Sequence, residues 1–218
     1  MAIPRITVLA SGRGSNLAAL LDAERAGRLG GTIVAVICNR AGAGALDIAA
    51  AHGVATTAIE HGAYADRDGF DAALAAAVDA GAPDLLVLAG FMRVLGPDFV
   101  ARYRGRMLNV HPSLLPSYPG LHTHRRALAD GVRVHGCTVH FVTGEVDHGP
   151  IVMQGAVPVH EGDDESALAA RVLEVEHRLL PAAVRAFCEH RLVIVGRQVR
   201  VKGELVPAAT LEVPSPAA

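Results

Sequence analysis

The sequence predicts an α/β protein with a doubly wound, mostly parallel sheet and an antiparallel C-terminal part. Two observations support this fold class. In the first half of the chain, short and continuously apolar runs alternate with segments of helical spacing, which is typical of parallel strands covered on both faces. In the second half, a run of alternating apolar and polar residues is followed by a segment that resembles its hairpin partner.

The first half is expected to contain four strands separated by three helices. Each strand segment is a short run dominated by Val, Ile, Leu, Thr or Ala, and each helical segment has helical spacing or is rich in Ala. In chain order we expect a strand at 6–10, a helix at 17–26, a strand at 32–38, a helix at 45–51, a strand at 55–59, a helix at 71–80 and a strand at 84–89.

The second half is expected to begin with a strand at 107–111 and a short helix at 125–129. Between them, residues 114–123 are rich in Pro, Gly and His, which predicts a lid or binding loop. The following elements are strands at 136–142 and 151–159, a long helix at 166–190 that Pro181 should kink or divide, and a hairpin at 191–206. We expect a single domain over residues 1–206 and a disordered Pro/Ala-rich tail at 207–218.

Composition excludes several classes of protein. The formal net charge is −2, so no bulk positive charge indicates a nucleic-acid partner. The three cysteines are far apart and lack a C-x-x-C pair, which suits a reducing cytoplasm. No signal peptide is evident, and no apolar run approaches the ~20 residues that span a bilayer. We therefore expect a cytoplasmic protein without a membrane partner.

A glycine loop at 11–16 directly follows the first expected strand and opens the first helix. Glycines allow close approach of a ligand to the backbone, and the free amides of a helix start favour an anion. Leu17 stands where the dinucleotide motif G-x-G-x-x-G requires its third glycine, and no G-K-[ST] follows. At this position in a doubly wound sheet, we favour a monophosphate site over an ordinary helix cap.

Asn109 and His111 should project from the same face of a strand that ends at Pro112, because side chains alternate along a strand. Asp147 follows a neighbouring expected strand, and a nearby carboxylate favours the protonated imidazole. Such a set suits a reaction in which a carbonyl oxygen gains negative charge and a nitrogen leaves. Because no Ser or Cys stands in an evident nucleophile motif, we expect direct transfer between two bound substrates.

Histidine is frequent in this region, with six of the eleven histidines at 111–148. A metal site must therefore be considered. No H-E-x-x-H or C-x-x-C pattern accompanies these histidines, so we expect no native metal.

Five blocks of the sequence resemble the folate-dependent formyltransferase family and extend in order over residues 5–191. The block around His111 is specific to this family, and the glycine loop narrows the resemblance to its ribonucleotide branch. The blocks are GRGSNL at 12–17, LAGFMRVL at 88–95, LNVHPSLLP at 108–116, YPGLHTH at 118–124 and VHFV at 139–142, with Asp147 after the last.

The resemblance implies a Rossmann-like fold and transfer of the formyl group of 10-formyltetrahydrofolate, as co-substrate, to the amine of glycinamide ribonucleotide in purine biosynthesis. It implies that His111 stabilises the oxyanion and protonates the leaving nitrogen, that Asn109 holds the formyl oxygen, and that Asp147 keeps the imidazole charged. It further implies a phosphate site at Gly14, Ser15 and Asn16, ribose contacts from Glu176, and folate contacts from Arg67, Met92, Arg93, Val94, Leu95 and Asn109.

Several of these residues also have a purely structural interpretation. Glu176 could be a solvated helix residue, Arg67 a surface ion-pair partner, and the apolar part of 92–95 a piece of core. His148 departs from the small residue expected after the Asp, and it could perturb His111. The alternatives for function are another formyltransferase or a hydrolase that uses 10-formyltetrahydrofolate, or a non-catalytic nucleotide-binding module. Whether the chain forms a homodimer stays open.

Overall fold

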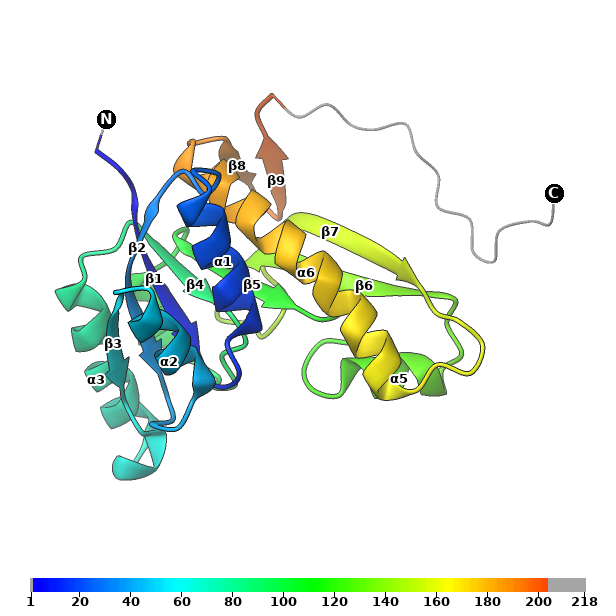
Figure 1. The fold of residues 1–218 in the computed structure, drawn as a ribbon, viewed down its shortest axis with the longest axis horizontal. Coiled ribbons are helices and arrows are strands. Elements are labelled where there is room, and N and C mark those ends of the chain that lie inside the picture. The colour runs from blue at the N-terminus through cyan, green and yellow to red at the C-terminus, as the bar shows by residue number, and fades with distance from the viewer. Residues whose placement is uncertain (1, 204–218) are drawn as a thin grey trace.

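The computed structural model describes residues 2–203, so the tail expected at 207–218 lies outside the described residues. In this part of the chain, one sheet joins nine strands in the order β3-β2-β1-β4-β5-β6-β7-β9-β8 (Figure 1). The strands are β1 (Arg5–Ala10), β2 (Thr32–Cys38), β3 (Ala55–Ala58), β4 (Leu85–Leu88), β5 (Met107–His111), β6 (Val134–Phe141), β7 (Ile151–Pro158), β8 (Leu192–Val195) and β9 (Gln198–Val201).

The first five strands are all parallel to one another. β6 runs antiparallel to β5 and β7 runs antiparallel to β6, while β9 lies parallel to β7 and antiparallel to β8. The predicted fold class is thereby confirmed, both in its mostly parallel sheet and in its antiparallel C-terminal part. A single domain extending to residue 206 stays a prediction.

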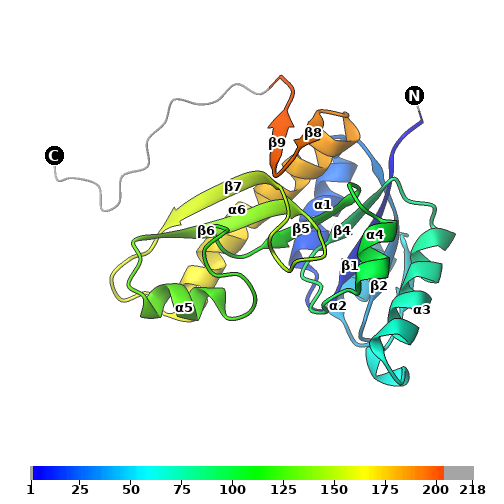
Figure 2. The same cartoon turned by 180° about the vertical axis from the view of Figure 1, so that it is seen from behind.

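Helices cover both faces of the parallel half. α1 (Ser15–Arg25), α2 (Gly44–Ala51) and α6 (Glu165–Cys188) lie over one face, and α3 (Arg67–Ala80) and α4 (Pro97–Arg102) lie over the other (Figures 1 and 2). Because side chains alternate along a strand, Val8 packs into the first core cluster and Leu9 into the second. Burial on both faces explains why the parallel strands are continuously apolar.

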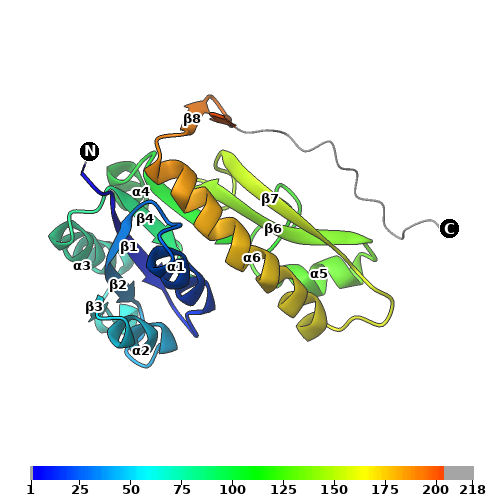
Figure 3. The same ribbon diagram turned by 45° about the horizontal axis from the view of Figure 1, so that its top comes forward.

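The β6–β7 hairpin extends beyond the parallel half and carries α5 (Thr123–Ala129) at its far end (Figure 3). A third core cluster fills the space between this hairpin and the first half of α6. It contains Cys137 and Val157 from the hairpin and Leu168 and Val172 from the helix. α6 therefore joins the two parts of the sheet on one face.

Two expectations about helices were wrong. Pro181 does not divide or end the long helix, since α6 runs unbroken from Glu165 to Cys188 with Pro181 inside it. A proline costs one backbone hydrogen bond, and here the burial of Leu180, Ala183 and Val184 around it outweighs that cost. The third helix was expected to start at residue 71, but α3 starts at Arg67 because the Asp66 side chain accepts the Gly69 N–H at 2.8 Å.

Two short elements were not predicted from the sequence, α4 and the 3-10 helix η1 (His61–Ala63). Both are too short to show a helical period, although Pro97 at the first position of α4 is a typical start signal. Within residues 2–203, no helix is long and apolar enough to cross a membrane.

Candidate active site

The carboxyl ends of β1, β4 and β5 lie side by side because these strands are parallel neighbours. From β1 the chain continues into α1 on one face of the sheet, and from β4 it continues toward α4 on the other. Ligands of doubly wound sheets bind at such a switch point, outside the carboxyl ends of the strands. Two cavities open at this edge of the sheet, and together they contain all but one of the predicted site residues.

The first cavity, of about 680 Å³, is formed by the glycine loop at 11–16 and by α6. Gly14 has a φ of 83°, and a Cβ there would come within 2.7 Å of the Ala45 Cα, so only glycine fits this position. Among the described residues, no side chain caps the start of α1. The N–H groups of its first turn are therefore available to an anion, as the prediction of a phosphate site requires.

Asn16 and Glu176 meet inside this cavity, although they lie 160 residues apart in the chain. The Asn16 Nδ2 group donates a hydrogen bond to Glu176 Oε2 at 2.7 Å. Burial raises the pKa of Glu176, and the hydrogen bond from Asn16 opposes that rise. The Glu176 carboxylate is thus held in the wall of the cavity. The alternative interpretation, that Glu176 is a solvated helix residue, is wrong.

Two arginines in the first cavity were not predicted as site residues. Arg13 lies within the glycine loop, and Arg40 follows the carboxyl end of β2, the strand beside β1. The position of Arg40 was the available signal, since the ends of neighbouring parallel strands share one edge of the sheet. Their cationic side chains give the cavity charge that is complementary to a phosphate.

The second cavity, of about 620 Å³, contains the other half of the predicted site. The segment at 92–95 forms part of its wall, with the side chains of Met92 and Val94 64% and 54% exposed. These two side chains are therefore not core residues. Arg67 lines neither cavity. It lies beside Gly96, the residue that follows this segment, and a Cβ added to Gly96 would be 3.6 Å from the Arg67 Cδ atom.

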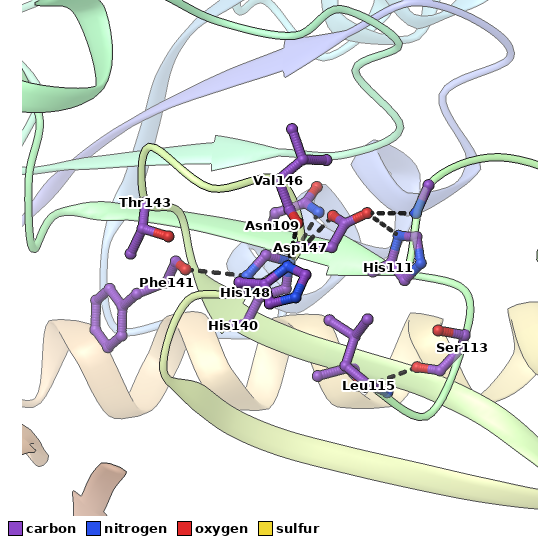
Figure 4. Close-up of polar contacts among 12 residues, drawn as sticks. Asn109, His111, Ser113, Leu115, His140, Phe141, Thr143, Val146, Asp147 and His148 are labelled. Atoms are coloured by element: carbon purple, nitrogen blue, oxygen red, sulfur yellow. Dashed lines mark hydrogen bonds and ion pairs between the residues drawn. The ribbon is translucent and has the colours of Figure 1, made fainter. Parts of the chain in front are cut away.

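Asn109, His111 and Asp147 come together in the second cavity (Figure 4). The His111 Nδ1 atom lies 3.5 Å from Asp147 Oδ2, and the Nε2 atom lies 2.9 Å from the Tyr118 carbonyl oxygen. A carboxylate and a carbonyl can only accept hydrogen bonds. The Nε2 atom of His111 therefore carries a hydrogen and donates it to the Tyr118 carbonyl oxygen, while the Nδ1 atom faces the carboxylate of Asp147.

Asp147 is fixed by the loop that the sequence predicts as a lid. Its backbone is left-handed, with a φ of 57°, and its Oδ2 atom accepts the Gly120 N–H at 2.8 Å. Since Tyr118 and Gly120 belong to the same loop, residues 114–122 contact both members of the His–Asp pair. The lid residues thus form part of the site in this conformation.

Asn109 is oriented by a histidine that was not predicted to belong to the site. His140 Nδ1 lies 3.0 Å from the Phe141 carbonyl oxygen and donates to it, so its Nε2 atom is free to accept from Asn109 Nδ2 at 3.1 Å. Burial lowers the pKa of His140, which keeps the ring neutral in this accepting form. His140 faces Asn109 across the β5–β6 pair, and this register could not be read from the sequence.

His124 and His135 form a pair of imidazole rings next to His111. Their rings pack edge to face with centroids 5.3 Å apart. Burial lowers the pKa of both, that of His135 to about 4. His148 lies elsewhere: its Nδ1 atom is 2.7 Å from the Val146 carbonyl oxygen and its Nε2 atom 3.6 Å from Glu145 Oε1. Within residues 2–203, no cluster of three or more His, Cys, Asp or Glu side chains could hold a metal ion.

The two cavities share one wall, which the residues Gly90, Met92, Val110, Pro112 and His124 form. A ligand on the glycine loop and a ligand beside His111 would therefore be neighbours. The fold and the site together define an α/β enzyme with two adjoining ligand cavities at the carboxyl edge of its sheet.

Comparison with known proteins identifies the family. Residues 4–184 match the family model described as formyl transferase, and the chain belongs to this family. It is 46% identical to the phosphoribosylglycinamide formyltransferase of Escherichia coli over 202 residues, covering 93% of this chain and 95% of the relative. It is 48% identical to the enzyme of that name from Mycobacterium tuberculosis over 193 residues, covering 88% and 89%.

Solved structures agree with this identification. The glycinamide ribonucleotide transformylase 1 of Symbiobacterium toebii superposes with a TM-score of 0.90 at 50% sequence identity, covering 91% of this chain and 94% of that one. The predicted membership of the formyltransferase family is thereby confirmed.

Proposed function

We propose that this enzyme transfers the formyl group of 10-formyltetrahydrofolate to the amine of glycinamide ribonucleotide, a step of purine biosynthesis. The relatives named above carry this activity in their names and match almost the whole chain. The wall shared by the two cavities supports this function most directly, because direct transfer requires that both substrates be bound side by side.

The first cavity would hold the ribonucleotide. The free N–H groups around Gly14, Ser15 and Asn16 suit its phosphate, and Arg13 and Arg40 supply positive charge. Glu176 would accept hydrogen bonds from the ribose hydroxyls. Asn16 would contribute as well, since its Oδ1 atom is buried and has no hydrogen-bond partner among the described residues.

The second cavity would hold the folate. The exposed side chains of Met92 and Val94 and the partly buried side chain of Leu95 would form the wall against the pterin ring, and Arg93 would contribute a positive charge. Arg67 is exposed and lies beside Gly96 at the end of this wall, so we assign it to the carboxylate end of the folate, outside the cavity. Both cavities are lined by residues of one chain.

The transfer itself would depend on Asn109 and His111. Attack of the amine on the formyl carbon forms a C–N bond and places negative charge on the formyl oxygen. Asn109 Nδ2 has a second hydrogen, beyond the one directed at His140, and would donate it to this oxygen, while the charged His111 stabilises the oxyanion. When the bond to the folate nitrogen breaks, His111 would give that nitrogen a proton.

Asp147 and the lid would control this proton. Asp147 Oδ2 lies 3.5 Å from His111 Nδ1 and would pair with the imidazolium in the transfer step, and the proton released by the amine would return through solvent to His111. The Nε2 hydrogen of His111 points at the Tyr118 carbonyl oxygen, which must give way before this hydrogen reaches a substrate atom. Substrate binding would therefore shift the loop at 114–122.

Cysteine chemistry supports a reducing compartment such as the cytoplasm. Cys38, Cys137 and Cys188 are all free and buried. Burial raises the pKa of these thiols, to about 11 for Cys38 and about 12 for the other two, so little reactive thiolate is present at neutral pH.

A comparison of acceptor substrates tests the proposed function. The purified protein is given 10-formyltetrahydrofolate with glycinamide ribonucleotide, with initiator methionyl-tRNA, or with buffer alone, and the formyl product is followed. We expect formylated ribonucleotide only. Transfer to tRNA, or release of formate without an acceptor, would replace the substrate assignment, and inactivity under all three conditions would contradict it.

A further inference from the structure

Ser11 connects the two cavities at the end of β1. Its backbone N–H donates to the Gly90 carbonyl oxygen at 3.2 Å, and its side-chain Oγ atom accepts the Met92 N–H at 2.7 Å. Ser11 is only 4% exposed and is the first residue of the glycine loop. Two hydrogen bonds therefore join the glycine loop to the segment that follows β4.

That segment belongs to both cavities. Gly90 and Met92 line the first cavity and the second, and the chain then continues into the wall at 92–95. At the other end of this wall, Asp71 Oδ2 accepts the Gly96 N–H at 2.7 Å. The wall is thus tethered at both ends, and only the tether at Ser11 leads to the glycine loop.

We propose that Ser11 is a positioning residue that couples the two binding sites, so that ribonucleotide on the glycine loop tightens folate binding. The inference rests on the proposed function and adds a coupling to it. An anion on the loop restrains Ser11, and Ser11 restrains Met92 through its Oγ atom. The folate then meets a wall that is already ordered and loses less conformational entropy on binding.

A different result is expected if the Ser11 hydroxyl has only a structural role. Its removal would lower the stability of the protein, or weaken both ligands by the same factor whether or not the other is bound. Only a coupling residue changes the ratio between the folate dissociation constants measured with and without ribonucleotide. This ratio is therefore the informative quantity.

The experiment uses tetrahydrofolate as the probe, because it lacks the formyl group and no reaction can occur. Its Kd is measured by calorimetry with and without saturating glycinamide ribonucleotide. For the wild type, we expect the ribonucleotide to lower this Kd about fivefold or more, the usual lower bound for coupled sites. For Ser11→Ala, the loss of one hydrogen bond should remove most of that factor.

Two further variants keep the test sharp. Thr7→Val is the matched control, because Thr7 lies on β1, the strand that leads to Ser11, and its buried Oγ1 atom has no hydrogen-bond partner among the described residues. This control should retain the wild-type ratio. Ser11→Cys preserves the size of the side chain but offers a weak acceptor, and it should lose the ratio as Ser11→Ala does. It replaces Ser11→Ala if that variant fails to fold.

The outcomes separate the inference from the proposed function. If the wild type binds both ligands and turns over, but Ser11→Ala and Ser11→Cys keep its ratio, the coupling role of Ser11 is overturned and the function stands. The same holds if the wild-type Kd does not respond to ribonucleotide. If the wild type binds no ribonucleotide at all, both are overturned.

Discussion

The side chains of Asn16 and Glu176 form a buried hydrogen bond of 2.7 Å that joins the first turn of α1 to the middle of α6. The carboxylate is expensive to bury, since burial raises the pKa of Glu176 despite this hydrogen bond. A protein that only needed the two helices to pack would be more stable with an apolar or neutral pair. The cost of the charge therefore supports a ligand role for Glu176.

Glu176→Gln should make the protein more stable and less able to bind the ribonucleotide. A carboxyl with a raised pKa destabilises the folded state as the pH rises through that pKa, and the Gln side chain removes this cost while still accepting from Asn16. We expect the Tm at pH 8 to rise by ~2–4 °C, the effect of about 1 kcal/mol, and the difference to vanish below pH 4.5. The KM for ribonucleotide should rise roughly tenfold. A variant that is destabilised, with an unchanged KM, would show a structural role instead.

His140→Phe should reduce kcat by roughly tenfold and leave the KM values nearly unchanged, because Asn109 loses the acceptor that orients its amide. His140→Gln keeps an acceptor on a neutral side chain and is the matched control. Steady-state kinetics of both variants check this prediction. Equal rates for the two variants would exclude an orienting role for His140.

Gly14→Ala should destabilise the protein by about 1–3 kcal/mol, the usual cost of a strained backbone position, with a further cost from the 2.7 Å approach of its Cβ to Ala45. The control is Gly12→Ala, because a Cβ on Gly12 meets no atom within 4 Å. Urea unfolding of both variants measures the difference. Equal stabilities would show that the loop has room for a side chain at residue 14.

Acid should destabilise the wild-type protein partly through His135. Burial lowers the pKa of His135 to about 4 from its usual 6.5, so the unfolded chain takes up a proton that the folded protein refuses. This contribution is fully present above pH 6.5 and is lost as the pH falls toward 4. In His135→Gln, thermal unfolding between these two pH values should show a shallower fall in Tm. A fall as steep as that of the wild type would contradict the assignment.

Much of the fold was predictable because parallel strands that are buried on both faces have a recognisable apolar sequence pattern. β2 and β5 were predicted with the observed bounds, since β2 is an apolar run between Gly31 and Asn39 and β5 alternates in character before it ends at Pro112. The unbroken α6 was not predictable at Pro181. The burial that compensates for the missing hydrogen bond arises only when the helix lies on the sheet.

The candidate site divides in the same way. Asn109 and His111 could be placed on one face of a strand from the position of Pro112 alone. The contacts from His140, Tyr118 and Ser11 depend on register and loop path, which no local pattern encodes. Arg40 could have been predicted from the sequence, since it is the second residue after β2, the strand beside β1.

In the proposed mechanism, His111 and Asp147 act together in the transfer step. The most direct measurement is single-turnover formyl transfer by the wild type, His111→Ala, Asp147→Asn and the control His148→Ala, whose polar contacts are to Glu145 and Val146. We expect the two site variants to lose about 10²–10⁴-fold in rate, as general acids and oxyanion donors do, with ribonucleotide binding retained and the control unaffected. Transfer at the wild-type rate in both site variants would contradict a catalytic role for the His111–Asp147 pair.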